Sequence, residues 1–274
     1  MSLEEKTADR TSSPRASGVP SAVSTMLIYL RSMGIFALIW YAGAWWIGNP
    51  VLLPSPVAVV QSLFSLIASG EVASNAASSL QRLAMGFAGA ALIGIPLGLL
   101  MGMSRILYAL VDPLIELLRP ISGIAWIPLG MFILGVGETL PTAIMFYGAF
   151  FPIVINTLIG VRSVDERLIQ AAKVLGVGRS SIILNVVLPA SLPNILVGLR
   201  LGAGAAWTAM VAAELIGAPS GLGFAVEWYR ELLMTPSVLA FVFLIGLFGY
   251  LFDKLLRALQ TAITPWANIS REVI

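Results

Sequence analysis

The sequence predicts an all-α protein that crosses a membrane about six times. Of its 274 residues, 58% are apolar and only 11% are charged, whereas soluble domains carry about 25% charged residues. A helix needs about 20 apolar residues to cross a bilayer, so six spans use roughly 120 residues and leave room for loops. This composition argues against a soluble enzyme. It also argues against disorder over most of the chain, because disorder requires low hydrophobicity and high charge.

Two absent residue types narrow the possible chemistry. The chain has no cysteine and no histidine, which removes disulfides, thiolate metal sites and the commonest general base. None of its three lysines, Lys6, Lys173 and Lys254, follows a glycine, so the phosphate-binding loop G-x-x-x-x-G-K-[ST] is missing. We therefore expect no ATP hydrolysis by that mechanism, and no catalytic, cofactor-binding or metal-binding residues in this chain.

Hydropathy divides the chain into four parts. Residues 1–25 are polar and rich in serine and proline, which predicts a disordered cytoplasmic tail. Residues 26–80 predict a first span at about 33–48 and an apolar helix at 57–69 that is too short to cross and suits the membrane interface. Residues 81–267 form the predicted core, and residues 268–274 form a second tail. The core contains predicted spans at 83–103, 109–135, 139–161, 195–217 and 237–260. If the first helix is peripheral, the spans number five.

Particular residues add detail to these spans. Pro113, Pro120 and Pro128 interrupt the third span, and the backbone groups that they free are tolerated where they line a cavity or are covered by protein. The fifth span carries small residues that allow close helix approach, at Gly198, Gly202 and Gly204.

The basic residues predict the orientation. With the N-terminus in the cytoplasm, most of the 16 lysines and arginines fall on the cytoplasmic side, and only Arg230 lies clearly outside. This distribution follows the positive-inside rule and places both termini in the cytoplasm.

The cytoplasmic segment 162–193 has the pattern of two short helices that meet at a glycine turn. Asp165 is the expected N-cap of the first helix and Gly176 its C-terminal stop. Leu168, Ala172 and Leu175 share one face of that helix. The second helix starts at Ser180 and is expected to end at Pro189. A compact, mostly apolar projection of this kind suits docking into a groove of a cytoplasmic partner.

The same segment resembles permease subunits of bacterial ATP-binding-cassette (ABC) importers. Their signature E-A-A-x3-G-x9-I-x-L-P is matched at the same spacing, with Gln170 in place of the glutamate and Val186 in place of the isoleucine. The matching positions are Gln170, Ala171, Ala172, Gly176, Val186, Leu188 and Pro189. By this resemblance, the segment couples the permease to its ATPase.

Further runs resemble the nitrate, taurine and sulfonate branch of that family, and taurine permease subunits most closely. These runs are 112–116, 119–121, 125–129, 135–139, 211–216, 221–224 and 256–260, and the resemblance covers about residues 50–267. It implies a type I importer permease fold in the bacterial inner membrane. It also implies a second copy of the chain, two ATPase subunits that bind ATP and Mg, and a periplasmic binding protein, with no nucleic-acid partner. The implied cargo is a small anion, taurine or another sulfonate first, with nitrate, bicarbonate or an aromatic carboxylate as alternatives.

Charged residues inside the spans are candidates for the translocation path. Glu214 lies within the fifth span, where a buried carboxylate needs a partner, and Arg82 at the start of the second span is the candidate. Asp112, Glu116 and Arg119 share one helical face. They are interpreted either as a charged lining of the path near the cytoplasmic gate, or as an intra-protein ion pair or charges that snorkel to the membrane interface.

Trp126 and Trp207 lie inside the third and fifth spans, and each indole N–H requires an acceptor. Their positions favour the third and fifth spans as walls of the translocation path. The alternative is that both side chains simply pack in the core. The candidate path or gate residues are therefore Arg82, Arg119, Trp126, Trp207 and Glu214. Two other classes of protein fit the sequence less well. A secondary transporter would need intramembrane coupling groups, and Glu214 is the single candidate for such a group. A membrane-embedded enzyme would have to work without histidine or cysteine.

Overall fold

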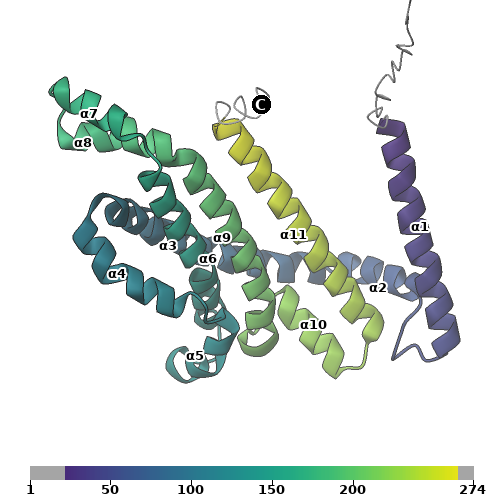
Figure 1. Ribbon diagram of the computed structural model, residues 1–274. Helices are drawn as coiled ribbons and strands as arrows, with labels where there is room; N and C mark the ends of the chain where they lie inside the picture. Colours follow the sequence, from purple (N-terminus) through teal and green to yellow (C-terminus); the bar gives the residue numbers. More distant parts are fainter. Residues whose placement is uncertain (1–21, 265–274) are drawn as a thin grey trace, which may run out of the picture.

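The computed structural model describes residues 22–264, and every regular element within that range is helical (Figure 1). The predicted all-α class is confirmed. In chain order the helices are α1 (Ala22–Ile47), α2 (Pro56–Ala68), α3 (Glu71–Met103), α4 (Arg105–Leu118), η1 (Gly123–Trp126), α5 (Ile127–Leu134), α6 (Thr139–Arg162), α7 (Glu166–Val174), α8 (Arg179–Ile182), the π-helical η2 (Ile183–Val187), α9 (Leu188–Gly217), α10 (Leu222–Glu231) and α11 (Thr235–Ile263).

Four helical segments are long and apolar enough to cross a membrane. They are α3, α6, the continuous run Arg179–Gly217 that ends in α9, and α11. The pair formed by α4 and the segment Gly123–Leu134 adds a fifth if its two arms are counted together. These five correspond to the predicted second to sixth spans. The predicted first span falls in α1, which is 26 residues long and lies outside that count.

The helix α6 lies at the centre of the packing, between α3 and α9, because glycines let the three backbones approach closely. A Cβ atom added at Gly98 of α3 would lie 2.7 Å from the carbonyl oxygen of Val154 in α6. One added at Gly202 of α9 would lie 2.8 Å from the carbonyl oxygen of Ala149. The predicted close approach is confirmed at Gly198 and Gly202. It is wrong at Gly204, where a Cβ would meet no atom within 4 Å.

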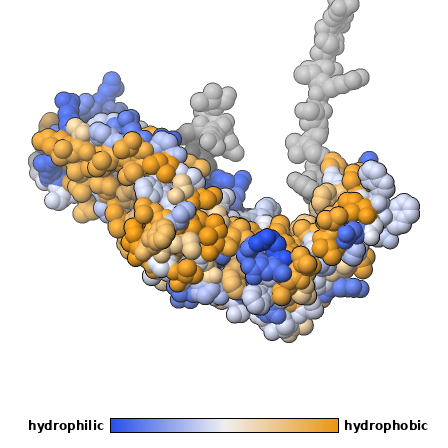
Figure 2. Space-filling model, turned by 90° about the horizontal axis from the view of Figure 1, so that it is seen from below, coloured by the Kyte–Doolittle hydropathy of each residue, from blue (hydrophilic) through white to orange (hydrophobic). Residues whose placement is uncertain are grey.

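The helix α1 stands at one edge of the molecule (Figure 1). Trp40 joins it to the rest: its ring stacks on Phe243 of α11 at 5.6 Å, and its indole N–H donates to the carbonyl of Pro54. Trp45 and Trp46 remain 81% and 86% exposed. Much of the molecular surface seen from below is hydrophobic, as Figure 2 shows, which suits contact with lipid.

The predicted third span is two helices bent by 85°. Pro113 lies inside α4 without ending it, Pro128 opens α5, and the chain breaks at Pro120. The break is stabilised by the hydroxyl of Tyr147, which lies 2.7 Å from the carbonyl of Leu118 and 3.2 Å from that of Ile121. Backbone acceptors freed by a break inside a membrane need such a partner.

The expectation that a helix ends at Pro189 is wrong. The chain stays helical from Arg179 to Gly217, and a π-helical turn at Ile183–Val187 precedes the proline. Pro189 lacks the N–H that would bond one turn back, and its ring would clash with the carbonyl there. A π turn widens the backbone at such a point and accommodates the proline without ending the helix.

Several predicted boundaries differ from the observed ones. α1 begins at Ala22, inside the predicted tail 1–25, and α3 begins at Glu71, well before the predicted start of the second span. A further helix that was not predicted from the sequence, α10, packs against α9 and α11. Residues 1–21 and 265–274, including the predicted C-terminal tail, lie outside the described residues.

The contact between α9 and α6 predicts opposite effects at two nearby glycines. Gly202→Ala forces a methyl group against the Ala149 carbonyl and should lower the free energy of unfolding by roughly 1–3 kcal/mol. Gly204→Ala adds the same group in open space, where replacing a helical glycine is neutral or stabilising. Thermal unfolding of the detergent-solubilised protein measures both. Equal midpoints for the two variants would contradict this packing.

Candidate functional site

The segment α7–α8 projects from one end of the molecule, at the top left of Figure 1. Its first helix begins as predicted, with the Asp165 carboxylate accepting from the backbone N–H of Arg167 at 2.9 Å. The turn after α7 requires Gly176, whose φ is +75°. Both expectations for this segment, the N-cap and the glycine turn, are confirmed.

The apolar residues of this segment divide between an inner and an outer side. Ile169 and Ala172 pack toward a small core, formed by Val161, Ile182 and Val187. The three residues predicted to share a face do not pack together, since Leu168 is 54% and Leu175 is 81% exposed while Ala172 is half-buried. Leu175 and Val174, which is 88% exposed, form an apolar tip. The remaining signature positions, Gln170, Ala171, Val186, Leu188 and Pro189, lie on α7, η2 and the start of α9.

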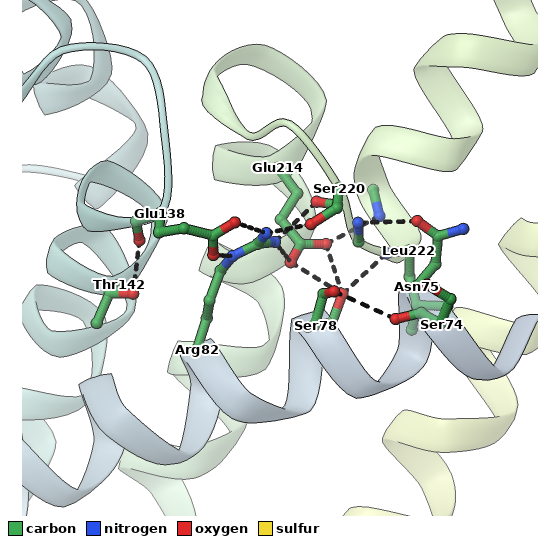
Figure 3. Close-up of polar contacts among 12 residues, drawn as sticks. Ser74, Asn75, Ser78, Arg82, Glu138, Thr142, Glu214, Ser220 and Leu222 are labelled. Atoms are coloured by element: carbon green, nitrogen blue, oxygen red, sulfur yellow. Dashed lines mark hydrogen bonds and ion pairs between the residues drawn. The ribbon is translucent and has the colours of Figure 1, made fainter. Parts of the chain in front are cut away.

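A second candidate site is built around Arg82, whose side chain is 1% exposed in α3 (Figure 3). Its Nη1 donates to Glu214 Oε1 at 2.8 Å and to the carbonyl of Ser220 at 2.7 Å. Its Nη2 donates to Glu138 Oε1 at 2.7 Å and to the hydroxyl of Ser220, and its Nε donates to Glu138 Oε2. All five N–H bonds of the guanidinium therefore have acceptors.

The Glu214 carboxylate, completely buried in α9, is held from other directions as well. The Ser79 hydroxyl lies 2.8 and 2.7 Å from its two oxygens, and the backbone N–H of Gly223 donates to Oε2 at 3.0 Å. Ser79 in turn accepts from the backbone N–H of Leu222 at 2.8 Å. A Cβ at Gly221, where φ is +115°, would lie 2.5 Å from the carboxylate, so this position requires glycine.

The predicted pairing of Arg82 with Glu214 is confirmed by this geometry. Glu138 and Ser220, which complete the network, were not predicted as its members, because they lie in loops far from α3 in the sequence. The hydrogen bond from Arg82 lowers the pKa of Glu138, and this effect outweighs the rise that burial alone would cause. A second pair, Arg200 with Asp253 at 2.9 Å, joins α9 to α11.

A cavity of about 570 Å³ lies where α4 ends. The break after α4, the middle of α6 and the middle of α9 form its walls. Its polar lining residues are Arg119, Ser122, Tyr147, Asn156 and Thr208. Of the five candidate path residues, only Arg119 lines this cavity; Arg82 and Glu214 lie in the separate network.

α4 runs away from the end of the molecule that carries α7 and α8 (Figure 1). Arg119 is the residue at the C-terminal end of α4, and it shares the cavity lining with residues from the middle of α6. Within residues 22–264 it forms no ion pair with Asp112 or Glu116. Arg119 keeps a helical backbone and a hydrogen bond to the Ile115 carbonyl, so it still ends the helix. The alternative of an intra-protein ion pair among these charges is nevertheless wrong within the described residues.

The two tryptophans do not line this cavity. Trp207 is buried and turns toward α11, where its ring lies 5.9 Å from that of Phe252. Trp126 borders a smaller apolar pocket of about 310 Å³ beside Tyr147. Its Nε1 is the one buried side-chain nitrogen or oxygen without a hydrogen-bond partner in the described part of the chain. α9 does form a cavity wall, but through Leu201, Ala205 and Thr208.

Residues 94–267, more than half of the chain, match the family described as binding-protein-dependent transport system inner membrane component. The chain belongs to this family. With its apolar helices, membership makes the permease a multi-pass inner-membrane protein. Within residues 22–264, no three acidic residues gather closely enough to hold a metal ion.

Named relatives place the permease in the branch of ABC permeases that includes taurine, sulfonate and nitrate permeases. It is 39% identical to a putative ABC transporter permease of Methanocaldococcus jannaschii, over 93% of this chain and 98% of the relative. It is 37% identical to the taurine transport system permease of Escherichia coli, over 86% and 89%. It is 34% identical to the nitrate import permease of Synechocystis sp., over 78% and 81%. The crystal structure of an amino acid ABC transporter has the same fold, with a TM-score of 0.59 at 16% identity over 73% of this chain and 96% of that one.

The Arg82 network predicts a large loss of stability when its centre is removed. Arg82→Ala leaves Glu214 buried without a counter-charge, which should lower the free energy of unfolding by about 3–5 kcal/mol. Arg82→Ala combined with Glu214→Ala should cost less than the sum of the two single variants. Thermal unfolding in detergent measures these effects.

Arg230→Ala serves as the matched control, because Arg230 pairs with Glu227 on the surface. Its melting temperature should stay close to that of the unmodified permease. A loss from Arg82→Ala no greater than that of Arg230→Ala would contradict the central position of Arg82.

Proposed function

We propose that this permease moves a small anion, taurine or another sulfonate first, from the periplasm to the cytoplasm as a subunit of an ATP-driven importer. The observation that carries the cargo is the 37% identity to a taurine permease over most of both chains. Nitrate is the alternative, favoured by the relative named for nitrate import. Bicarbonate and aromatic carboxylates remain open.

In the proposed assembly, two copies of the chain enclose the path, two ATPase subunits bind ATP and Mg in the cytoplasm, and a binding protein delivers the cargo from the periplasm. The apolar tip at Val174 and Leu175 supports docking to an ATPase. Both side chains are more than four-fifths exposed at the turn after α7, and an exposed apolar surface of this kind commonly marks a site of contact with another protein. This docking places α7, α8 and both termini in the cytoplasm.

The continuous helix from Arg179 to Gly217 supports a mechanical link between the two candidate sites. Its 39 residues are helical without a break, although the direction changes between α8 and α9 (Figure 1). One end carries α8 and the other carries Glu214. A push on α7 and α8 when the ATPases close therefore reaches the Arg82 network through one continuous helical segment. In this proposal the domains divide as the sequence predicts, with residues 162–193 as the coupling segment of the core.

Docking at the apolar tip is tested with Leu175→Asp. Leu175 is 81% exposed, so the fold should persist while the charge disrupts an apolar contact. We expect the variant to lose most of the ATPase that co-purifies with the unmodified permease. Leu232→Asp, at the turn after α10 and 50% exposed, is the control and should keep the ATPase. Full retention of the ATPase by Leu175→Asp would exclude this docking surface.

The cargo is tested in proteoliposomes that contain the permease with the ATPase and binding protein encoded beside it. ATP-dependent uptake of labelled taurine is expected, with little uptake of nitrate. Nitrate uptake without taurine uptake would favour the alternative. Uptake that follows an ion gradient without ATP would contradict an ATP-driven importer.

A further inference from the structure

The cavity at the end of α4 is an open recess whose lining carries charge of one sign only. Arg119 is its only basic residue, and no carboxylate lines it. Within residues 22–264 the Arg119 guanidinium forms no ion pair. Arg119 is exposed and the recess beside it is open at the surface of the single chain. A basic residue without a counter-charge between apolar spanning helices commonly marks a path for an oppositely charged species. The pattern therefore calls for an anionic group beside Arg119.

The other polar groups of the cavity offer oxygen atoms as acceptors. The Tyr147 hydroxyl already donates to a carbonyl at the break after α4, and the Thr208 hydroxyl donates to the Ala205 carbonyl at 2.9 Å. The Asn156 amide nitrogen donates to the Pro152 carbonyl at 2.8 Å, which leaves its Oδ1 for other donors. Each hydroxyl has a single proton, so these oxygens have lone pairs left.

An aromatic face accompanies these acceptors. The rings of Tyr147 and Phe151, both in the cavity wall, meet edge to face at 5.0 Å. Acceptor oxygens together with aromatic rings suit an ammonium group, which has three donors and is attracted to π faces. Nitrate and bicarbonate carry no such group and would use Arg119 alone.

We infer that this cavity is a substrate subsite for a short zwitterion, with Arg119 binding its sulfonate and Asn156, Thr208 and Tyr147 surrounding its ammonium group. A sulfonate can accept two parallel hydrogen bonds from a guanidinium. The inference rests on the proposed function and deepens it: the permease itself discriminates aminosulfonates from simple anions, in addition to any selection by a binding protein.

The test separates the permease from its binding protein. Calorimetry on the purified permease–ATPase complex measures binding of taurine, ethanesulfonate and nitrate. Taurine should bind about tenfold or more tightly than either of the others, since only taurine satisfies both halves of the cavity. Arg119→Gln should weaken taurine binding by about tenfold or more, and Arg119→Lys by less, because lysine keeps the charge without the fork of donors.

Two further variants sharpen the test. Thr208→Val removes an acceptor at nearly constant volume and should weaken taurine binding without changing that of ethanesulfonate. Arg105→Gln, at the opposite end of α4 and outside the cavity lining, is the matched control and should bind taurine as the unmodified complex does. Co-purification of the ATPase confirms that each variant assembles.

The outcomes distinguish this inference from the proposed function. ATP-dependent taurine uptake in proteoliposomes without taurine binding to the complex alone would overturn the subsite and leave the function standing. Nitrate binding as tight as taurine binding, or unchanged binding by an assembled Arg119→Gln complex, would also overturn the subsite. Taurine binding without any taurine uptake would overturn the proposed cargo instead.

Discussion

The guanidinium of Arg82 holds together segments that are distant in the sequence. It joins α3 to Glu138 before α6, to Glu214 of α9 and to Ser220 in the loop before α10. A charge buried so completely is tolerated only because every donor has a partner. The positions of α3, α9 and the α10 loop therefore depend on one another. The glycine at 221 follows from the same constraint, because a side chain there would displace the carboxylate.

Close helix packing provides the second constraint. Glycines in α3 and α9 bring these helices against α6, so the centre of the molecule is dense, and a cavity opens where α4 bends away. The bend thus creates the cavity and places Arg119 beside it. The proline that interrupts the third span is therefore a functional feature in this proposal. It converts one span into two arms with a polar recess between them.

The sequence allowed some elements to be predicted well and others poorly. The Asp165 cap and the Gly176 turn were predictable because they depend on neighbouring residues only. The Arg82–Glu214 pair was predictable because a buried charge demands a partner and few candidates exist at that depth. By contrast, the continuation of the helix through Pro189 depends on a π turn, and no local sequence pattern predicts that turn. The directions of Trp126 and Trp207 depend on which helix packs on each face.

The sequence alone determined that this chain is helical, lies in a membrane, lacks catalytic histidine and cysteine, and carries a permease signature. Those properties depend only on the composition or on short stretches of sequence, so they can be read without knowledge of the fold. Only the tertiary structure decided that Arg82 is fully paired, that Arg119 forms no ion pair with Asp112 or Glu116 in the described residues, and that hydroxyl and amide side chains line the same recess. Such relations join residues from different helices, and their geometry exists only once those helices have packed.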